Sequence, residues 1–285
     1  MKKILSMLLV ACVMAFFGCE KDDSVSGQGE SSGEVETKDC FYFEAVNGIA
    51  VVSMYKGGKD KLSGEYEYGM PPEVSLEYSL NKGKWKPFVV GETDVALHNA
   101  GDRVYIRATD VNESFCKLVE DEQGNRHFIN NYFGTYKGNG SVKVGGNIMY
   151  LLDGTGSKKE FDTSLNKYAF YELFCGMLLT DASELVLPAT TLACGCYARL
   201  FDDCMLTAAP VLPATKLAEE CYDNMFHRNT KLKSVEVGFT DWESSATNEW
   251  LKSVSSTGTF TCPEGLDVSR RDESHVPEGW TIVRK

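Results

Sequence analysis

The sequence predicts a mainly β protein with short helical segments, in which an N-terminal antiparallel β-sandwich is followed by a short solenoid and a C-terminal cap. Between residues 40 and 150, short runs of alternating apolar and polar residues are separated by Gly, Pro and Asn, which is typical of strands joined by tight turns. After residue 150 the chain becomes self-similar with a period of about 25 residues, which is typical of stacked repeats. Because 43% of the 285 residues are hydrophobic, the chain can fill packed cores, and wholesale disorder is excluded.

The N-terminus has the pattern of an export signal. Two lysines precede an apolar run over residues 4–17, which is too short to span a bilayer comfortably and predicts a signal peptide over residues 1–18. The run ends at Gly18-Cys19, a stretch that resembles the lipobox at which bacterial lipoproteins are lipidated and cleaved, with Phe16 where Leu is usual. The resemblance implies that Cys19 is the lipidation site, and stable anchoring then needs two or more acyl chains. A plain secretory signal with a chance cysteine is the alternative.

Residues 19–39 are acidic and rich in Ser and Gly, and they are too polar to form a core, so we expect a flexible tether. Acidic residues directly behind the cysteine resemble the surface-export signal of lipoproteins in the Bacteroides group, although a solvated linker has the same composition. We therefore expect a lipid-anchored protein at the outer membrane, exposed on the cell surface. The chain has 41 acidic residues against 29 Lys and Arg, which argues against binding to nucleic acid.

The segment 40–150 predicts the sandwich. Strands are expected at residues 41–43, 49–55, 74–80, 85–90 and 104–108. In residues 74–80 every second side chain is apolar, as one buried sheet face requires, and Asn81-Lys82-Gly83-Lys84 supplies a hairpin turn before the next strand. An antiparallel sandwich of about seven or more strands follows. Cys40 and Cys116 are the thiols of this segment, and their spacing leaves open whether they form a disulfide.

The repeats are marked by aromatic residues and by a Leu-Pro-Ala-Thr phrase. Phe174, Phe201 and Phe226 recur at intervals of 27 and 25 residues, and Pro188 and Pro213 are expected where strands end. One coil cannot bury its own apolar face, so the coils must stack, and equivalent Leu, Phe and Cys side chains then form ladders. Phe201 is accordingly expected in the core.

These repeats are similar to those of BspA-type leucine-rich-repeat surface proteins of anaerobic gut and oral bacteria. The Cys-Tyr-x-x-Leu/Met-Phe and Leu-Pro-Ala-Thr phrases carry the resemblance, which covers residues 145–285 best. It implies leucine-rich repeats over 151–240, a capping segment over 241–285, and a non-catalytic role in adhesion or protein-ligand binding. Leucine-rich repeats bind through the surface of their strands, and the candidate ligand-facing positions are Thr207, Ala208, Lys233, Ser234 and Glu236.

Residues with the spacing of a catalytic or metal site were not found, so we expect no enzyme, metal or cofactor. The four histidines are scattered, and Cys194, Cys196 and Cys204 form no Cys-x-x-Cys pair. Cys175 and Cys204 have no Cys-His signature that would supply a base. The acidic pairs Glu219-Glu220 and Asp202-Asp203 are expected to be solvated.

A second hypothesis is a glycan-binding surface lipoprotein in which the sandwich does the recognition. Two or three exposed rings in a row would favour it. The aromatic candidates are Tyr42, Tyr55, Tyr66, Tyr68, Trp85 and Tyr105.

Overall fold

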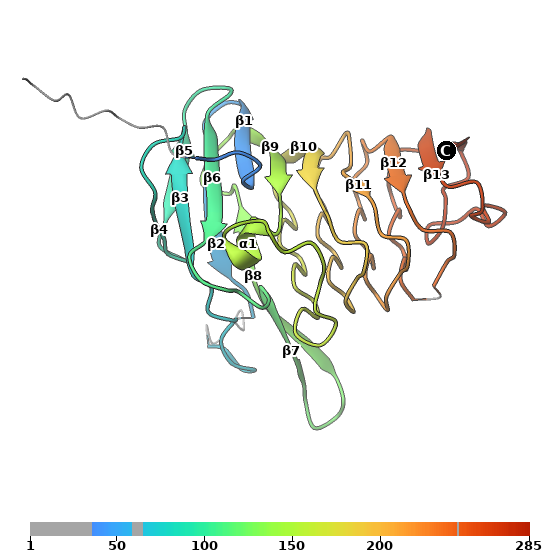
Figure 1. Ribbon diagram of the computed structural model, residues 1–285, viewed down its shortest axis with the longest axis horizontal. Coiled ribbons are helices and arrows are strands. Elements are labelled where there is room, and N and C mark those ends of the chain that lie inside the picture. The colour runs from blue at the N-terminus through green and yellow to red at the C-terminus, as the bar shows by residue number, and fades with distance from the viewer. Residues whose placement is uncertain (1–35, 59–64, 244) are drawn as a thin grey trace, which may run out of the picture. The chain divides into compact units, whose positions relative to one another are not determined.

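A computed structural model describes residues 36–58, 65–243 and 245–285 (Figure 1). The prediction of a mainly β fold is confirmed, since α1 (Tyr150–Asp153) is the only helix among the described residues and the strands form three sheets. The predicted signal peptide, Cys19 and most of the tether lie outside the described residues.

The largest sheet has six strands and is antiparallel except at one end. Its order is β10 (Leu179–Val186), β9 (Ser141–Asn147), β1 (Tyr42–Asn47), β6 (Arg103–Ala108), β3 (Leu76–Leu80), β4 (Lys86–Phe88). The predicted hairpin is confirmed, because β3 and β4 pair antiparallel across the turn at Asn81 and Lys82, which have φ of 49° and 60°. These left-handed residues suit a tight hairpin turn.

The second sheet is antiparallel and packs against the first. Its order is β5 (Asp94–Leu97), β2 (Ala50–Lys56), β8 (Arg126–Gly134), β7 (Cys116–Glu120). Phe43 of β1 and Phe133 of β8 meet between the two sheets with ring centroids 5.1 Å apart, and both side chains are fully buried. All five strands expected in this part of the chain are present, whereas β5, β7, β8 and β9 were not anticipated.

The six-stranded sheet continues into the repeats. β10 of the first coil pairs parallel to β9. The second sheet also contacts the first coil, because the Phe133 amide of β8 donates to the carbonyl of Leu173. One buried hydrophobic cluster contains both Phe41 and Trp280 and crosses residue 150 without interruption.

The third sheet is parallel and consists of one short strand from each successive coil. Its order is β11 (Val211–Leu212), β12 (Ser234–Val237), β13 (Gly258–Cys262), β14 (Trp280–Arg284). In Figure 1 the strands from β9 to β13 follow one another in a row, with the rest of each coil on one side of them. Pro188 and Pro213 come just after β10 and β11, as expected for strand ends. The parallel stacking continues beyond residue 240 through β13 and β14.

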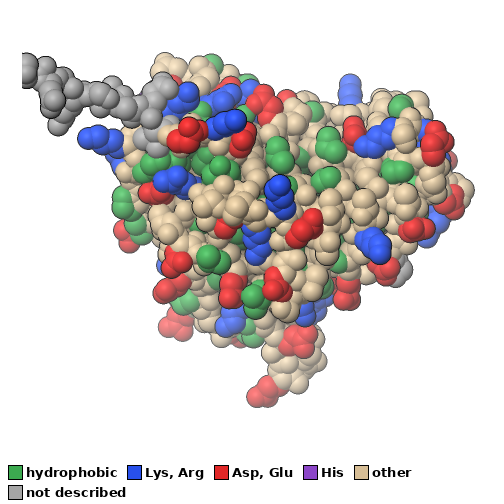
Figure 2. All heavy atoms as spheres, in the orientation of Figure 1, with side chains coloured by type: hydrophobic (Ala, Val, Ile, Leu, Met, Phe, Trp, Pro, Cys, Tyr) green, Lys and Arg blue, Asp and Glu red, His purple; other side chains and the backbone are tan. Residues whose placement is uncertain are grey.

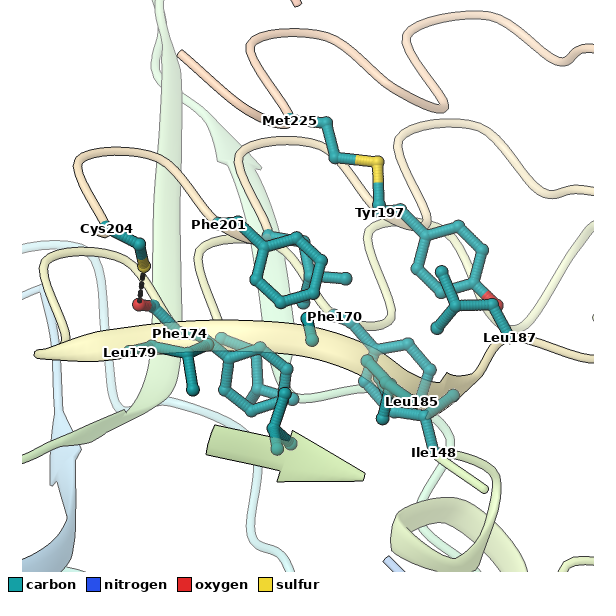
Figure 3. Close-up of a cluster of buried hydrophobic side chains, with 14 of the residues drawn as sticks. Ile148, Phe170, Phe174, Leu179, Leu185, Leu187, Tyr197, Phe201, Cys204 and Met225 are labelled. Carbon is teal, nitrogen blue, oxygen red and sulfur yellow. Dashed lines mark hydrogen bonds between the residues drawn. The ribbon is translucent and has the colours of Figure 1, made fainter. Parts of the chain in front are cut away.

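Two ladders of aromatic rings fill the coils (Figure 3). In one ladder, Phe201 lies 5.5 Å from Phe174 and 5.6 Å from Phe226 between ring centroids, and all three are fully buried. A second ladder has centroid spacings of 5.9–6.2 Å and consists of Phe170, Tyr197, Tyr222, Trp250. The predicted ladder of Phe side chains is therefore confirmed.

The backs of the coils are held by backbone hydrogen bonds rather than by strands. Alternate amides donate to the next coil, as from Glu172 to the carbonyl of Ala198, and those between them donate three residues back, as from Leu173 to Phe170. The equivalent residues Glu172, Arg199 and Asn224 all have φ of 50–54°. A left-handed residue at this point lets the chain bend tightly while every buried amide keeps a partner.

Asp202 is a correction to the sequence-based expectation. It is only 1% exposed, and its carboxylate binds Arg199 Nη2 at 2.5 Å and His227 Nδ1 at 2.9 Å. Its neighbour Asp203 is exposed, as expected. Asp202 is equivalent to Cys175 and His227 on the flanking coils, so the stacking itself brings acid and base together.

The cysteines in the described residues are free thiols, including Cys40 and Cys116, which lie in different side-chain clusters. Cys196 and Cys221 are buried at equivalent positions of two coils, as the repeat alignment predicted.

Candidate functional site

The outward face of the parallel strands is the candidate site. Val235 and Val237 of β12 point into the core, which leaves Ser234 and Glu236 on the opposite face. The register aligns Glu236 with one residue on each neighbouring strand, and we call this line the outer row: Val211, Glu236, Thr261, Val283.

Val186 extends the outer row onto β10. Both Val186 and Val211 directly precede the Leu of a Leu-Pro-Ala-Thr phrase, so they occupy the same place on two coils. The exposed fractions of Val186, Val211 and Val283 are 50%, 48% and 43%. Aligned exposed valines on a folded surface are unusual, because scattered single apolar residues are the ordinary case.

The five ligand-facing positions predicted from sequence fall into two groups. Ser234 and Glu236 lie on the outward strand face, where Glu236 pairs with Lys285. Thr207, Ala208 and Lys233 lie in the turns just before β11 and β12, and Thr207 donates its hydroxyl to the carbonyl of Thr180 at 3.0 Å. The sequence-based prediction did not include the valines of the outer row. The position before each repeated Leu-Pro phrase would have revealed two of them.

A cavity of about 880 Å³ adjoins the outer row at β10. Val186 and Glu184 line one side of it, Tyr42, Arg103 and Tyr105 line the sheet side, and residues 36–40 also contribute. Pockets of this volume are typical of small-molecule or peptide sites. The cavity therefore extends the exposed strand surface onto the six-stranded sheet.

The charged groups around this cavity compensate one another. Tyr42 donates its hydroxyl to Glu184, and this hydrogen bond holds the pKa of the carboxyl below its usual range. Lys143 Nζ lies 3.3 Å from Glu184 and 3.2 Å from Glu44, while the Arg103 guanidinium pairs with Glu44 and lies 4.3 Å from the centre of the Tyr42 ring. Figure 2 shows acidic and basic side chains interspersed over the side of the molecule that it presents. Such a surface favours a ligand with both polar and apolar groups over a strongly charged one.

The aromatic residues considered for glycan binding lie on different sheets and differ in exposure. Tyr42 and Tyr105 are buried beneath the cavity, and Trp85 lies under the Arg107 guanidinium at 4.1 Å. Tyr55 is half-exposed on the other sheet and stacks on a ring that sequence reasoning did not select, Tyr132. Two further candidates are half-exposed: Tyr66, Tyr68.

The thiols considered as nucleophiles are protonated near neutral pH. Burial raises the pKa of Cys175 to about 12, and the buried Cys204 donates its thiol to the carbonyl of Phe174 at 3.0 Å (Figure 3). A thiol becomes a nucleophile as the thiolate, so neither environment favours covalent chemistry. No group of three or more His, Cys, Asp or Glu in the described part of the chain is placed to hold a metal ion. Within that same part, no helix is sufficiently long and apolar for a membrane span.

Comparison with known proteins gives no further identification: no family model matches the sequence, and no curated protein or solved structure is significantly similar to it.

Proposed function

We propose that the protein is a non-catalytic lipoprotein of the cell surface that binds a protein ligand through the outer row. In this proposal the coils form a leucine-rich-repeat solenoid, and the two antiparallel sheets form a β-sandwich that supports it. The exposed valines at equivalent strand positions, Val186, Val211 and Val283, carry the proposal. They offer a protein partner apolar area that costs little to desolvate, and Glu236 and Thr261 between them supply polar contacts.

Binding is tested on purified extracellular-matrix proteins immobilised as a panel. Substitution of Val211 by Glu replaces an exposed apolar side chain of the proposed interface with a charged one, so affinity for any bound matrix protein should fall at least roughly tenfold. Val111→Glu is the matched control, because Val111 is 70% exposed and lies in the first part of the chain. Equal binding by the two variants would exclude the outer row as the interface.

Attachment to the membrane is tested separately in bacterial cells. Labelled palmitate should be incorporated into the protein, and Cys19→Ala should abolish both the label and the membrane association. Protease added to intact cells should digest the protein if it is displayed outside. A Cys19→Ala protein that still carries label would disprove the assignment of the lipid anchor.

A further inference from the structure

Three tyrosines form a second surface, on the solvent side of the antiparallel sheet that contains β2 and β8. Met54 of β2 and Phe133 of β8 point into the core, so their neighbours Tyr55 and Tyr132 point outward. Tyr55 and Tyr132 are paired across the strands with ring centroids 5.6 Å apart, and Tyr136 lies 5.6 Å from Tyr55 and is 59% exposed. We call Tyr55, Tyr132 and Tyr136 the tyrosine face.

Two glycines make room for this arrangement. A Cβ on Gly134, the last residue of β8, would lie 2.5 Å from a ring carbon of Tyr136 and 2.8 Å from one of Tyr55. A Cβ on Gly176 of the first coil would lie 3.2 Å from the Tyr136 hydroxyl oxygen. The Tyr136 ring therefore packs against glycine backbone from two separate parts of the chain, and the Tyr55 ring packs against one of them.

Polar groups flank the tyrosine face, and their charges cancel. On one side Lys137 binds Asp94 at 2.8 Å, and Ser53 donates to the same carboxylate at 2.5 Å. On the other side Glu172 binds Arg199 Nε at 3.0 Å. Glu172 lies in the same coil as Gly176, which is next to the Tyr136 hydroxyl.

We propose that the tyrosine face binds a neutral oligosaccharide. Aromatic rings stack on the apolar C–H faces of pyranose units, and tyrosine adds a hydroxyl that can hydrogen-bond the ligand. The carboxylates of Asp94 and Glu172 can bond sugar hydroxyls, and neither flank carries an uncompensated charge that would select an anionic or cationic ligand. The tyrosine face and the outer row are on different sheets. The glycan proposal can therefore be tested independently of the proposed binding of a protein ligand.

The test is native gel electrophoresis of the purified chain through gels containing one polysaccharide each: starch, xylan, mannan, galactan, β-glucan or the acidic pectin. At least one neutral polysaccharide should retard migration, and Tyr136→Ala should weaken that binding at least about tenfold, which corresponds to the loss of one stacked ring. Tyr136→Phe, which keeps the ring, should retain most of the binding. Tyr150→Ala is the matched aromatic control, because Tyr150 lies in α1, outside both the tyrosine face and its flanking pairs.

Retardation by none of the neutral polysaccharides, by pectin alone, or equally for Tyr136→Ala and the unchanged chain would overturn the proposal. Val211→Glu should leave the retardation unchanged, since it alters only the outer row.

Discussion

Phe201 and Asp202 are adjacent residues that stabilise the coils in different ways. Phe201→Ala should lower the free energy of unfolding by roughly 3–5 kcal/mol, because a ring between two other rings is lost. Asp202→Ala should lower it by about 1–3 kcal/mol, because Arg199 and His227 lose their shared acceptor. Urea denaturation checks both values. Asp203→Asn, which keeps a residue tolerant of positive φ at an exposed position, is the control and should change the value by less than about 0.5 kcal/mol.

Alignment of the repeats could identify Phe201 as a core residue but not Asp202, since a charged residue in a sequence predicts exposure. The environment of Asp202 depends on which residues stand one coil before and after it. An effect of Asp202→Ala within about 0.5 kcal/mol would mean that its ion pairs contribute nothing.

Arg228 shows the cost of the left-handed positions on the coils. It is exposed and has φ of 63°, a conformation that costs an L-residue roughly 1–2 kcal/mol. Arg228→Gly relieves this strain but adds about 0.5–1 kcal/mol of backbone entropy loss, so stability should stay equal or rise by up to about 1.5 kcal/mol. Arg228→Val should destabilise by about 1–3 kcal/mol, because a β-branched residue fits this conformation worst. Thermal melts that rank Val above Gly in stability would contradict the assigned backbone.

At the scale of elements, one ion pair links the β7–β8 hairpin to the coils. Arg126 binds both oxygens of Glu220 at 2.8 and 2.9 Å, and Tyr168 donates to the same carboxylate at 2.7 Å. The hydrogen bonds from Arg126 are the largest cause that lowers the pKa of Glu220. Sequence reasoning expected Glu220 to be simply solvated, and the partner missed lies 94 residues away in β8.

The lowered pKa of Glu220 predicts a pH dependence of stability. The native pKa lies below the value of about 4.3 in the unfolded chain, so the stabilisation is present above that pH and is lost as the pH falls through the native pKa. Glu220→Gln should therefore lower the free energy of unfolding by about 1 kcal/mol at pH 7, and this difference should shrink as the pH falls below about 4. Urea titrations at several pH values check this. Glu219→Gln, on the exposed neighbouring residue, should show no such convergence.

The elements that sequence could predict are those whose pattern is local. The sequence of β3 alternates strictly between apolar and polar residues, and the coils are marked by Phe at intervals of 27 and 25 residues. β8 was missed because Asn131, a polar residue, is fully buried in it, and β9 because two adjacent glycines, Gly145 and Gly146, interrupt its pattern. Beyond residue 240 the aromatic ladder continues with Trp250 in the place that Phe or Tyr holds in earlier coils. The tyrosine face could not be predicted, because it forms only when two strands pair and two distant glycines lie next to the rings, and no local sequence pattern shows this.

At the scale of the whole described chain, the two antiparallel sheets and the coils share one core. Phe41 stacks on Phe174 of the first coil with centroids 5.9 Å apart, and β9 has coil strand β10 as one of its two partners. A fragment ending near residue 150 would expose the β9 edge and this ring. We therefore expect residues 40–150 to be unfolded or aggregated in isolation, with no cooperative melt by circular dichroism.

Hydrogen exchange on the full chain distinguishes one cooperative unit from two. If the shared core couples the parts, the slowest amides of β1 and of the first coils should open with the same free energy, because neither can unfold without exposing the other's apolar face. β14 should exchange faster, since a coil at the end of a stack has a neighbour on one side only. Phe41→Ala then becomes the decisive variant. It removes a ring directly before β1, yet it should accelerate exchange equally in β1 and around Phe174. Acceleration confined to the antiparallel sheets would mean that the ring contact does not couple them to the coils.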